Sequence, residues 1–173
     1  MPVDYSGQDL RGRDFSGQNL TGANLTRAIL TGANLAGVDL WGAKLSGVDL
    51  SGRDFSGQNL SYADLTGADL TGADLTGANL TGANLWGANL IGATLTRANL
   101  RSANLSRAYL EDADLRGANL TRATLIGANL TGANLYGANF TDANLYGAFI
   151  RPGISRIDME GAEGLDTVKG LID

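Results

Sequence analysis

The chain of 173 residues has no cysteine, no histidine, only two prolines and few aromatic residues, 6% of the total. Without cysteine it has no disulfide framework and no thiolate metal site. Without histidine it lacks the commonest general base and the commonest metal ligand. No stretch approaches the roughly 18 consecutive apolar residues of a membrane-spanning helix. We therefore expect no cofactor, no metal site, no membrane association and no enzymatic activity.

Positive charge is also in short supply, because 18 acidic residues face 13 basic ones and give a net charge of −5. An acidic chain is poorly suited to bind nucleic acid directly, although five arginines between residues 97 and 122 form a modest basic region. The segment Met1–Ser6 lacks the charged and apolar regions of a signal peptide. We expect a cytoplasmic protein.

Glycine is the residue in excess, with 25 copies, and such a composition by itself would permit disorder. The pattern argues otherwise, because the chain repeats with a period of five. Every fifth position from Tyr5 to Ile150 is bulky and apolar, and 25 of these 30 positions are leucine. Two residues earlier 22 of 30 positions are alanine, one residue earlier 24 are asparagine or aspartate, and two residues later 21 are glycine. The register does not slip between Val3 and Pro152.

Neither common secondary structure can use a period of five. On an α-helix five residues turn about 500°, which scatters the leucines around the surface. On a flat strand an odd period places successive leucines on opposite faces. The chain must turn once per repeat, which predicts four sides, about 20 residues per coil, and coils stacked at about 4.8 Å. Leucine and alanine then point inward, glycine occupies the turn, and asparagine or aspartate bonds the turn backbone.

Segments such as Ala63–Gly67 (Ala-Asp-Leu-Thr-Gly) and Ala78–Gly82 (Ala-Asn-Leu-Thr-Gly) resemble the pentapeptide repeat family, and the resemblance covers residues 3–152. It implies an all-β fold, a right-handed quadrilateral β-helix. The family is abundant in cyanobacteria, and this sequence looks like a cyanobacterial example. The chain also reads as two adjacent short repeat proteins joined in one.

We expect the β-helix over residues 1–152 and a C-terminal cap over residues 153–173. Four residues of the cap have helical spacing and predict a short amphipathic capping helix: Leu165, Val168, Leu171 and Ile172. A frayed tail is one alternative, because Gly170 weakens so short a helix. A homodimer through the C-terminal end is another, since terminal segments sometimes mediate dimers in the family.

The inward alanine column is interrupted by Gln8, Arg13 and Gln18, and again 40 residues later by Arg53 and Gln58. The first three side chains could close or hydrate the first coil. A functional interpretation makes the arginines and glutamines a polar binding feature. We favour a duplication in which each arginine turns outward or pairs with a local aspartate, because burying an unpaired arginine is costly.

Bulky apolar residues also occupy positions that should face solvent, and they gather toward the C-terminal half. The candidate interaction surface consists of Trp86, Ile126 and Tyr146 in one column, Tyr109 and Phe149 in a second, and Tyr136 on the next face. Such a zone can mark self-association or partner binding, and scattered surface aromatics are the alternative. Trp41 and Tyr62 are expected to be more isolated.

These observations favour a non-enzymatic structural or protein-interaction scaffold whose protein partner is unknown. No serine or threonine has an evident activating base, and there is no phosphate loop or dinucleotide fingerprint. The alternative rests on the resemblance: some acidic family members imitate duplex DNA and bind DNA gyrase, which gives quinolone resistance. The net charge agrees with that alternative. Two observations argue against it. Residues 76–150 carry four acids and five bases, and no loop interrupts the register, whereas the quinolone-resistance proteins often carry projecting loops.

Overall fold

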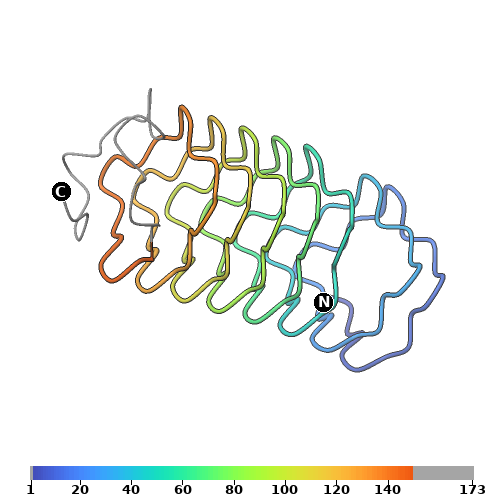
Figure 1. Cartoon of the computed structure of the whole chain (residues 1–173). Coiled ribbons are helices and arrows are strands. Elements are labelled where there is room, and N and C mark those ends of the chain that lie inside the picture. The colour runs from blue at the N-terminus through green and yellow to red at the C-terminus, as the bar shows by residue number, and fades with distance from the viewer. Residues whose placement is uncertain (1, 150–173) are drawn as a thin grey trace.

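The computed structural model describes residues 2–149, which form a solenoid of stacked coils (Figure 1). Parallel β-bridges join residues 20 positions apart, as in Asp64↔Asn84 and Asn84↔Asn104. Each five-residue unit has one bridge residue followed by a two-residue turn, for example Asp64 and then Thr66–Gly67. A coil of 20 residues therefore has four turns. Residues 2–149 contain no helix, so none is long and apolar enough to cross a membrane.

Neighbouring coils are held together by a backbone hydrogen-bond ladder. The Leu65 N–H donates to the Asn84 carbonyl (2.7 Å), and the Asn84 N–H donates back to the Ala63 carbonyl (2.9 Å). At the turn the Gly67 N–H donates to the Trp86 carbonyl (3.0 Å). The same three bonds recur along most of the solenoid, so the backbone polar groups find partners between coils instead of within one segment.

The core is the inside of this tube. The leucine column and the alanine column are buried together in one hydrophobic cluster that runs from Leu10 to Leu145. Leucines in the middle coils, such as Leu85, have no exposed surface. Burying each leucine contributes about 1.5–3 kcal/mol. Alanine recurs beside it because, with coils about 4.8 Å apart, only a small side chain fits between stacked leucines.

The turns explain the glycines. The second turn residue has a positive φ at 21 glycines between Gly7 and Gly147. The Leu65 carbonyl accepts from the Ala68 N–H (3.0 Å), which together with the positive φ of Gly67 is typical of a type II turn. The Asp64 carboxylate accepts from the Thr66 N–H (3.1 Å) and fixes the turn from outside. These contacts confirm the predicted roles of glycine and of asparagine or aspartate.

Non-glycine residues adopt the same positive φ at eight turns: Arg27, Tyr62, Arg97, Ser102, Arg107, Asp112, Arg122 and Asp142. The predicted C-terminal cap with its helix of Leu165, Val168, Leu171 and Ile172 lies outside the described residues.

Candidate interaction surface

All six residues predicted as an interaction surface project to solvent, and each is at least 41% exposed. Trp86, Ile126 and Tyr146 are first turn residues at one corner of the solenoid. Tyr109 and Phe149 are bridge residues on the side that starts from this corner, where they pair with Asn89 and Asn129 respectively. Five of the six therefore border one side.

The same side contains two exposed apolar residues that the sequence interpretation missed. Ile29 is a bridge residue in the column of Tyr109 and Phe149, but it lies in the N-terminal half, and it is 44% exposed. Ile91 is the first turn residue at the other corner of this side and is 38% exposed. Tyr136 lies one corner further around the coil and does not border this side. We use the name aromatic side for the group that the fold brings together: Trp86, Ile91, Tyr109, Ile126, Tyr146 and Phe149.

Two charged residues accompany the aromatic side. The Arg107 guanidinium lies over the Trp86 ring, 5.7 Å from its centroid, in cation–π geometry. Glu111 accepts a hydrogen bond from the Asn129 side-chain amide through one carboxylate oxygen. Its other carboxylate oxygen is buried and has no hydrogen-bond partner among residues 2–149.

Trp41 and Tyr62 were expected to be isolated, and that prediction is wrong. Their rings meet edge to face, with centroids 5.9 Å apart. Trp41 is a first turn residue and Tyr62 is a second turn residue of the next coil, 21 positions later. Trp86 and Arg107 have the same separation, so a spacing of 21 residues is the sequence signal that could have found both contacts.

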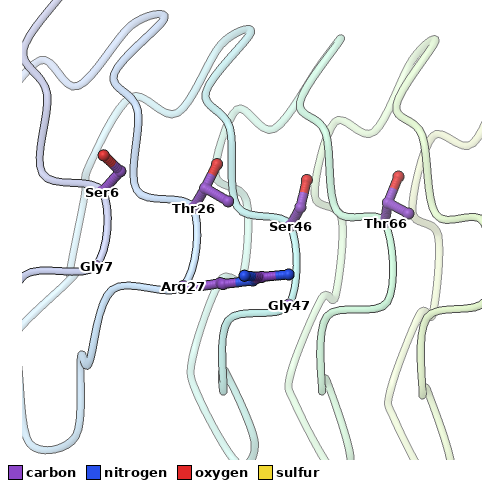
Figure 2. A pocket seen from close by; sticks show the side chains of 7 residues that line it. All are labelled: Ser6, Gly7, Thr26, Arg27, Ser46, Gly47 and Thr66. Carbon is purple, nitrogen blue, oxygen red and sulfur yellow. The ribbon is translucent and has the colours of Figure 1, made fainter.

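The corner that carries Trp86 continues into the N-terminal half as a row of hydroxyl groups. Figure 2 shows Ser6, Thr26, Ser46 and Thr66 pointing the same way along this corner, with Arg27 extending along the solenoid beside them. They line a shallow groove of about 600 Å³. One column of the repeat is thus polar in the N-terminal half and apolar in the C-terminal half.

Two of these hydroxyls donate hydrogen bonds to the carboxylate of Asp64. The Ser46 hydroxyl donates to Asp64 (2.7 Å), and the Thr66 hydroxyl and N–H donate to its other oxygen. Burial raises the pKa of Asp64, but the hydrogen bonds from Thr66 and Ser46 outweigh it and hold the pKa below the ordinary value. The groove offers hydroxyls and one cation, with no basic group that would activate a nucleophile.

The polar residues that replace alanine in the inward column lie differently in the first coil and in the third coil. At the N-terminal end Arg13 is exposed, and the Gln8 side-chain amide donates to the Asp4 carbonyl (3.0 Å), which closes the first coil. Arg53 instead lies partly buried between coils. Its guanidinium donates to the carbonyls of Ala33 (2.8 Å) and Leu30 (2.7 Å). The interpretation that each arginine turns outward or pairs with an aspartate is therefore wrong for Arg53, because backbone carbonyls of the preceding coil compensate its burial.

No three acidic side chains within residues 2–149 come together in a group that could hold a metal ion. Asp49 and Asp69 stack as one bridged pair, and Asp54 and Asp74 as another.

The sequence matches the family profile described as pentapeptide repeats, in eight copies, over residues 9–52, 42–77, 54–87, 78–117 and 118–151. Among solved structures, it is 38% identical to HetL, a pentapeptide repeat protein involved in heterocyst differentiation regulation from the cyanobacterium Nostoc sp. strain PCC 7120. That match covers 91% of this chain and 73% of HetL, with a TM-score of 0.80.

A second similar structure is a pentapeptide repeat protein from the thylakoid lumen of Arabidopsis thaliana. It is 44% identical over 58% of this chain and 70% of its own, with a TM-score of 0.57. A trypsin-treated variant of QnrB1, a plasmid-mediated fluoroquinolone resistance protein, is 21% identical over 94% of this chain and 89% of its own, with a TM-score of 0.47. No functionally curated protein matched the sequence. The five-residue period, the stacked coils and these matches together show that the chain belongs to the pentapeptide repeat family.

Proposed function

We propose that this protein is a non-enzymatic structural or protein-interaction scaffold, and that its aromatic side binds a protein partner. The observation that carries the proposal is that, within residues 76–150, six exposed apolar side chains gather on one side of a repeat whose outward positions are mostly polar. A group of exposed apolar side chains on one side of a protein can mark an association site. The chain also has no histidine or cysteine with which to do common catalytic chemistry.

The residues of the aromatic side define the chemistry of the partner. Trp86 and Tyr146 offer large apolar contact areas with a polar edge, which suits interfaces. Arg107 is exposed and offers a cation beside the apolar area. The matching partner is an apolar segment that also carries an acidic group or a hydrogen-bond acceptor.

The similarity to HetL supports a regulatory use of such a surface, because HetL is itself involved in the regulation of heterocyst differentiation. We further infer that the solenoid is right-handed and four-sided, as the resemblance to the family implies. The four turns in each 20-residue coil support the four-sided form.

The test is a comparison of the wild type with the double variant Tyr146→Asp, Phe149→Asp, both in affinity capture from the source cell and in sedimentation. We expect the double variant to lose a partner protein that the wild type retains, or to lose self-association. The matched control is Ser16→Asp, Thr21→Asp, which changes exposed residues at other corners and should behave as the wild type. Identical partners and identical mass for all three proteins would refute a role for the aromatic side.

The gyrase-binding alternative is decided with the same preparation. If the protein is a scaffold with a different partner, gyrase supercoiling should be unaffected at low micromolar protein. Inhibition at that concentration would replace the scaffold proposal with DNA mimicry.

A further inference from the structure

The backbone ladder is open on two consecutive sides between the second coil (residues 21–40) and the third coil (residues 41–60). No backbone hydrogen bond joins residues 29–38 to residues 49–58. The two coils stay joined on either side of this opening, where Leu25 N–H donates to the Lys44 carbonyl (2.8 Å) and Leu40 N–H donates to the Asn59 carbonyl (3.0 Å). We call the opening the mouth and residues 29–38 and 49–58 its lips. In Figure 1 the blue coils at this end stand apart from the evenly spaced coils that follow.

Arg53 is the physical cause of the opening. It occupies an inward position that is alanine in the coils on both sides, at Ala33 and Ala73. An arginine side chain cannot fit in the space of an alanine between coils about 4.8 Å apart. It lies in the mouth instead, where its guanidinium donates to the Ala33 and Leu30 carbonyls of the upper lip, residues 29–38.

Gln58 closes the last turn of the lower lip, residues 49–58, with the same hydrogen bond that is found in the first coil of the solenoid. Its side-chain amide donates to the Asp54 carbonyl (3.1 Å), and at the true N-terminal end Gln18 donates in the same way to the Asp14 carbonyl (3.1 Å). The side-chain oxygen of Gln58 is buried without a partner in the described part of the chain. The solenoid therefore contains a second N-terminal edge in its interior.

Both lips carry backbone groups that have no hydrogen-bond partner within residues 2–149. They include the N–H groups of Leu30, Gly32, Leu35 and Gly37 on the upper lip, and the N–H groups of Asp49 and Asp54 with the carbonyls of Asp49 and Ser51 on the lower lip. Unpaired backbone groups at a β edge can pair with an added strand. At the corner between the two open sides the mouth widens into a cleft of about 300 Å³ lined by Thr31, Gly32, Asp49, Ser51, Gly52 and Arg53.

We propose that the mouth binds a short extended peptide segment. A row of unpaired N–H and C=O groups is the hydrogen-bonding complement of one ligand chemistry, the backbone of an extended peptide, which adds to a β edge as a further strand. The interior behind the upper lip is the leucine core, including Leu30 and Leu35. The inward residues of the peptide must therefore be apolar or small, as they are in the pentapeptide pattern itself.

Arg53 is the gate of this site. One of its two hydrogen bonds occupies the Ala33 carbonyl, whose equivalent one coil later, the Arg53 carbonyl, accepts from the Asp74 N–H of the next coil (2.9 Å). An incoming strand needs this carbonyl. The exposed Arg13, at the equivalent position two coils earlier, shows that the side chain can face solvent at such an edge. Peptide binding replaces the side-chain bond of Arg53 to the Ala33 carbonyl with a backbone bond and turns the guanidinium outward.

Amide hydrogen exchange on the full chain tests whether the mouth is open in solution. We expect the N–H groups of Leu30, Leu35 and Asp54 to exchange at least about 100-fold faster than those of Leu50, Phe55 and Asp74, which hold the equivalent places one coil later and are paired. Equal protection of the two sets would mean that the ladder is closed there, and it would overturn the proposal.

Binding is tested by titrating the full chain with a synthetic peptide of the regular repeat, Ala-Asp-Leu-Thr-Gly-Ala-Asp-Leu-Thr-Gly, which copies residues 68–77. We expect amide NMR shifts at Leu30, Gly32 and Leu35 and about 10-fold slower exchange at these three sites near saturation. A peptide with proline in place of both leucines lacks the needed N–H groups and should give neither change. No response to the leucine peptide at an open mouth would refute a peptide site.

The matched variant is Arg53→Ala, Gln58→Ala, which restores the residue found at most inward positions. It should close the ladder, protect the three upper-lip amides, and abolish the peptide response. Peptide binding that persists in a variant with protected amides would place the peptide elsewhere and overturn the proposal.

Discussion

Each turn residue is constrained by the residue 20 positions later, because the two lie on top of one another. Tyr62 takes a glycine position with φ of 59°, and its ring lies over Gly82. A Cβ at Gly82 would be 2.7 Å from the Tyr62 Cε1 atom. Arg97 lies over Gly117 in the same way, with its Cγ 3.5 Å from where a Cβ would be. Tyr62 and Arg97 are thus each followed by a glycine one coil further on, whereas Arg122 is followed by Asp142, with which it forms an ion pair (3.7 Å).

Gly82→Ala should therefore destabilise the protein more than Gly72→Ala. Both positions have a φ near +65°, which costs alanine about 1–2 kcal/mol, but Gly72 has open space where its Cβ would be. At Gly82 the Tyr62 ring must also move and lose its contact with Trp41. Urea unfolding of the two variants gives the difference, and tryptophan fluorescence reports the contact. Equal loss of stability with unchanged fluorescence would contradict the stacking argument.

Asp64 should make stability depend on acid pH. Its pKa is lowered in the folded protein although burial opposes this, because the hydrogen bonds from Thr66 and Ser46 favour the carboxylate. The stabilisation is present above the unfolded pKa of about 3.9 and is lost as the pH falls through the lower folded pKa. NMR titration of the carboxyl carbon should give a midpoint below about 3.9.

The variant Asp64→Asn provides the control for that titration. Asparagine occupies the same column at Asn84 and Asn104 and keeps an oxygen for the Thr66 N–H. Its thermal unfolding temperature should fall less than that of the wild type between pH 5 and pH 3. An identical fall would show that Asp64 does not contribute.

The structural element of this protein is the coil, and every coil repeats the same layer of leucine and alanine. Leu85 is fully buried in a middle coil, between the leucines of the coils before and after it. Leu85→Ala should cost about 2–5 kcal/mol, because the closely packed layer cannot collapse around the cavity. The exposed Thr21→Ala should cost less than about 0.5 kcal/mol. Urea unfolding measures both, and a small loss at Leu85 would mean that neighbouring coils relax into the space.

The coil is also the level at which the sequence prediction was incomplete. The period of five predicted coils of 20 residues, buried leucine and alanine, and turns at glycine. It did not predict where the side chains of Arg53 and Gln58 would lie in the third coil. The position of Arg53 depends on which carbonyls of the preceding coil lie within reach of its guanidinium. Only the stacked coils provide that information.

Over the whole molecule, the two halves of the solenoid differ in surface character. Residues 1–75 carry nine acids and five bases, whereas residues 76–150 carry four acids and five bases. The corner lined by Ser6, Thr26, Ser46 and Thr66 in the first half carries Trp86, Ile126 and Tyr146 in the second. The first half is therefore more acidic and richer in hydroxyl groups at this corner, and the second half is more apolar there.

The whole solenoid should open from its N-terminal end. A stack in which each coil contacts only its neighbours unfolds where an interface is weakest. The interface between the second and third coils lacks its ladder on two sides, so we expect the amides of Leu20 and Leu25 to exchange faster in low denaturant than that of Leu85. Hydrogen exchange measured against denaturant tests this order. Uniform exchange over the three amides would indicate one cooperative unit.

The candidate surface shows the same division between what could and could not be predicted. Columns of residues 20 apart were enough to select Trp86, Ile126 and Tyr146. They did not reveal Ile91, because it is alone in its column, nor the contact between Trp41 and Tyr62, because these residues belong to different columns of adjacent coils. Whether two side chains on either side of a corner meet depends on how the chain turns there. The five-residue period does not specify that geometry.

The sequence by itself determined the coil, because no other arrangement keeps a leucine every fifth residue inside and gives each glycine a turn. The tertiary structure alone decided which outward residues meet and where the ladder fails. Both depend on side chains that reach across the space between coils, as Arg53 does to the Leu30 carbonyl and Arg107 does to the Trp86 ring. A repeat fixes the positions of its backbone, whereas contacts between its irregular residues are fixed only when the coils are stacked.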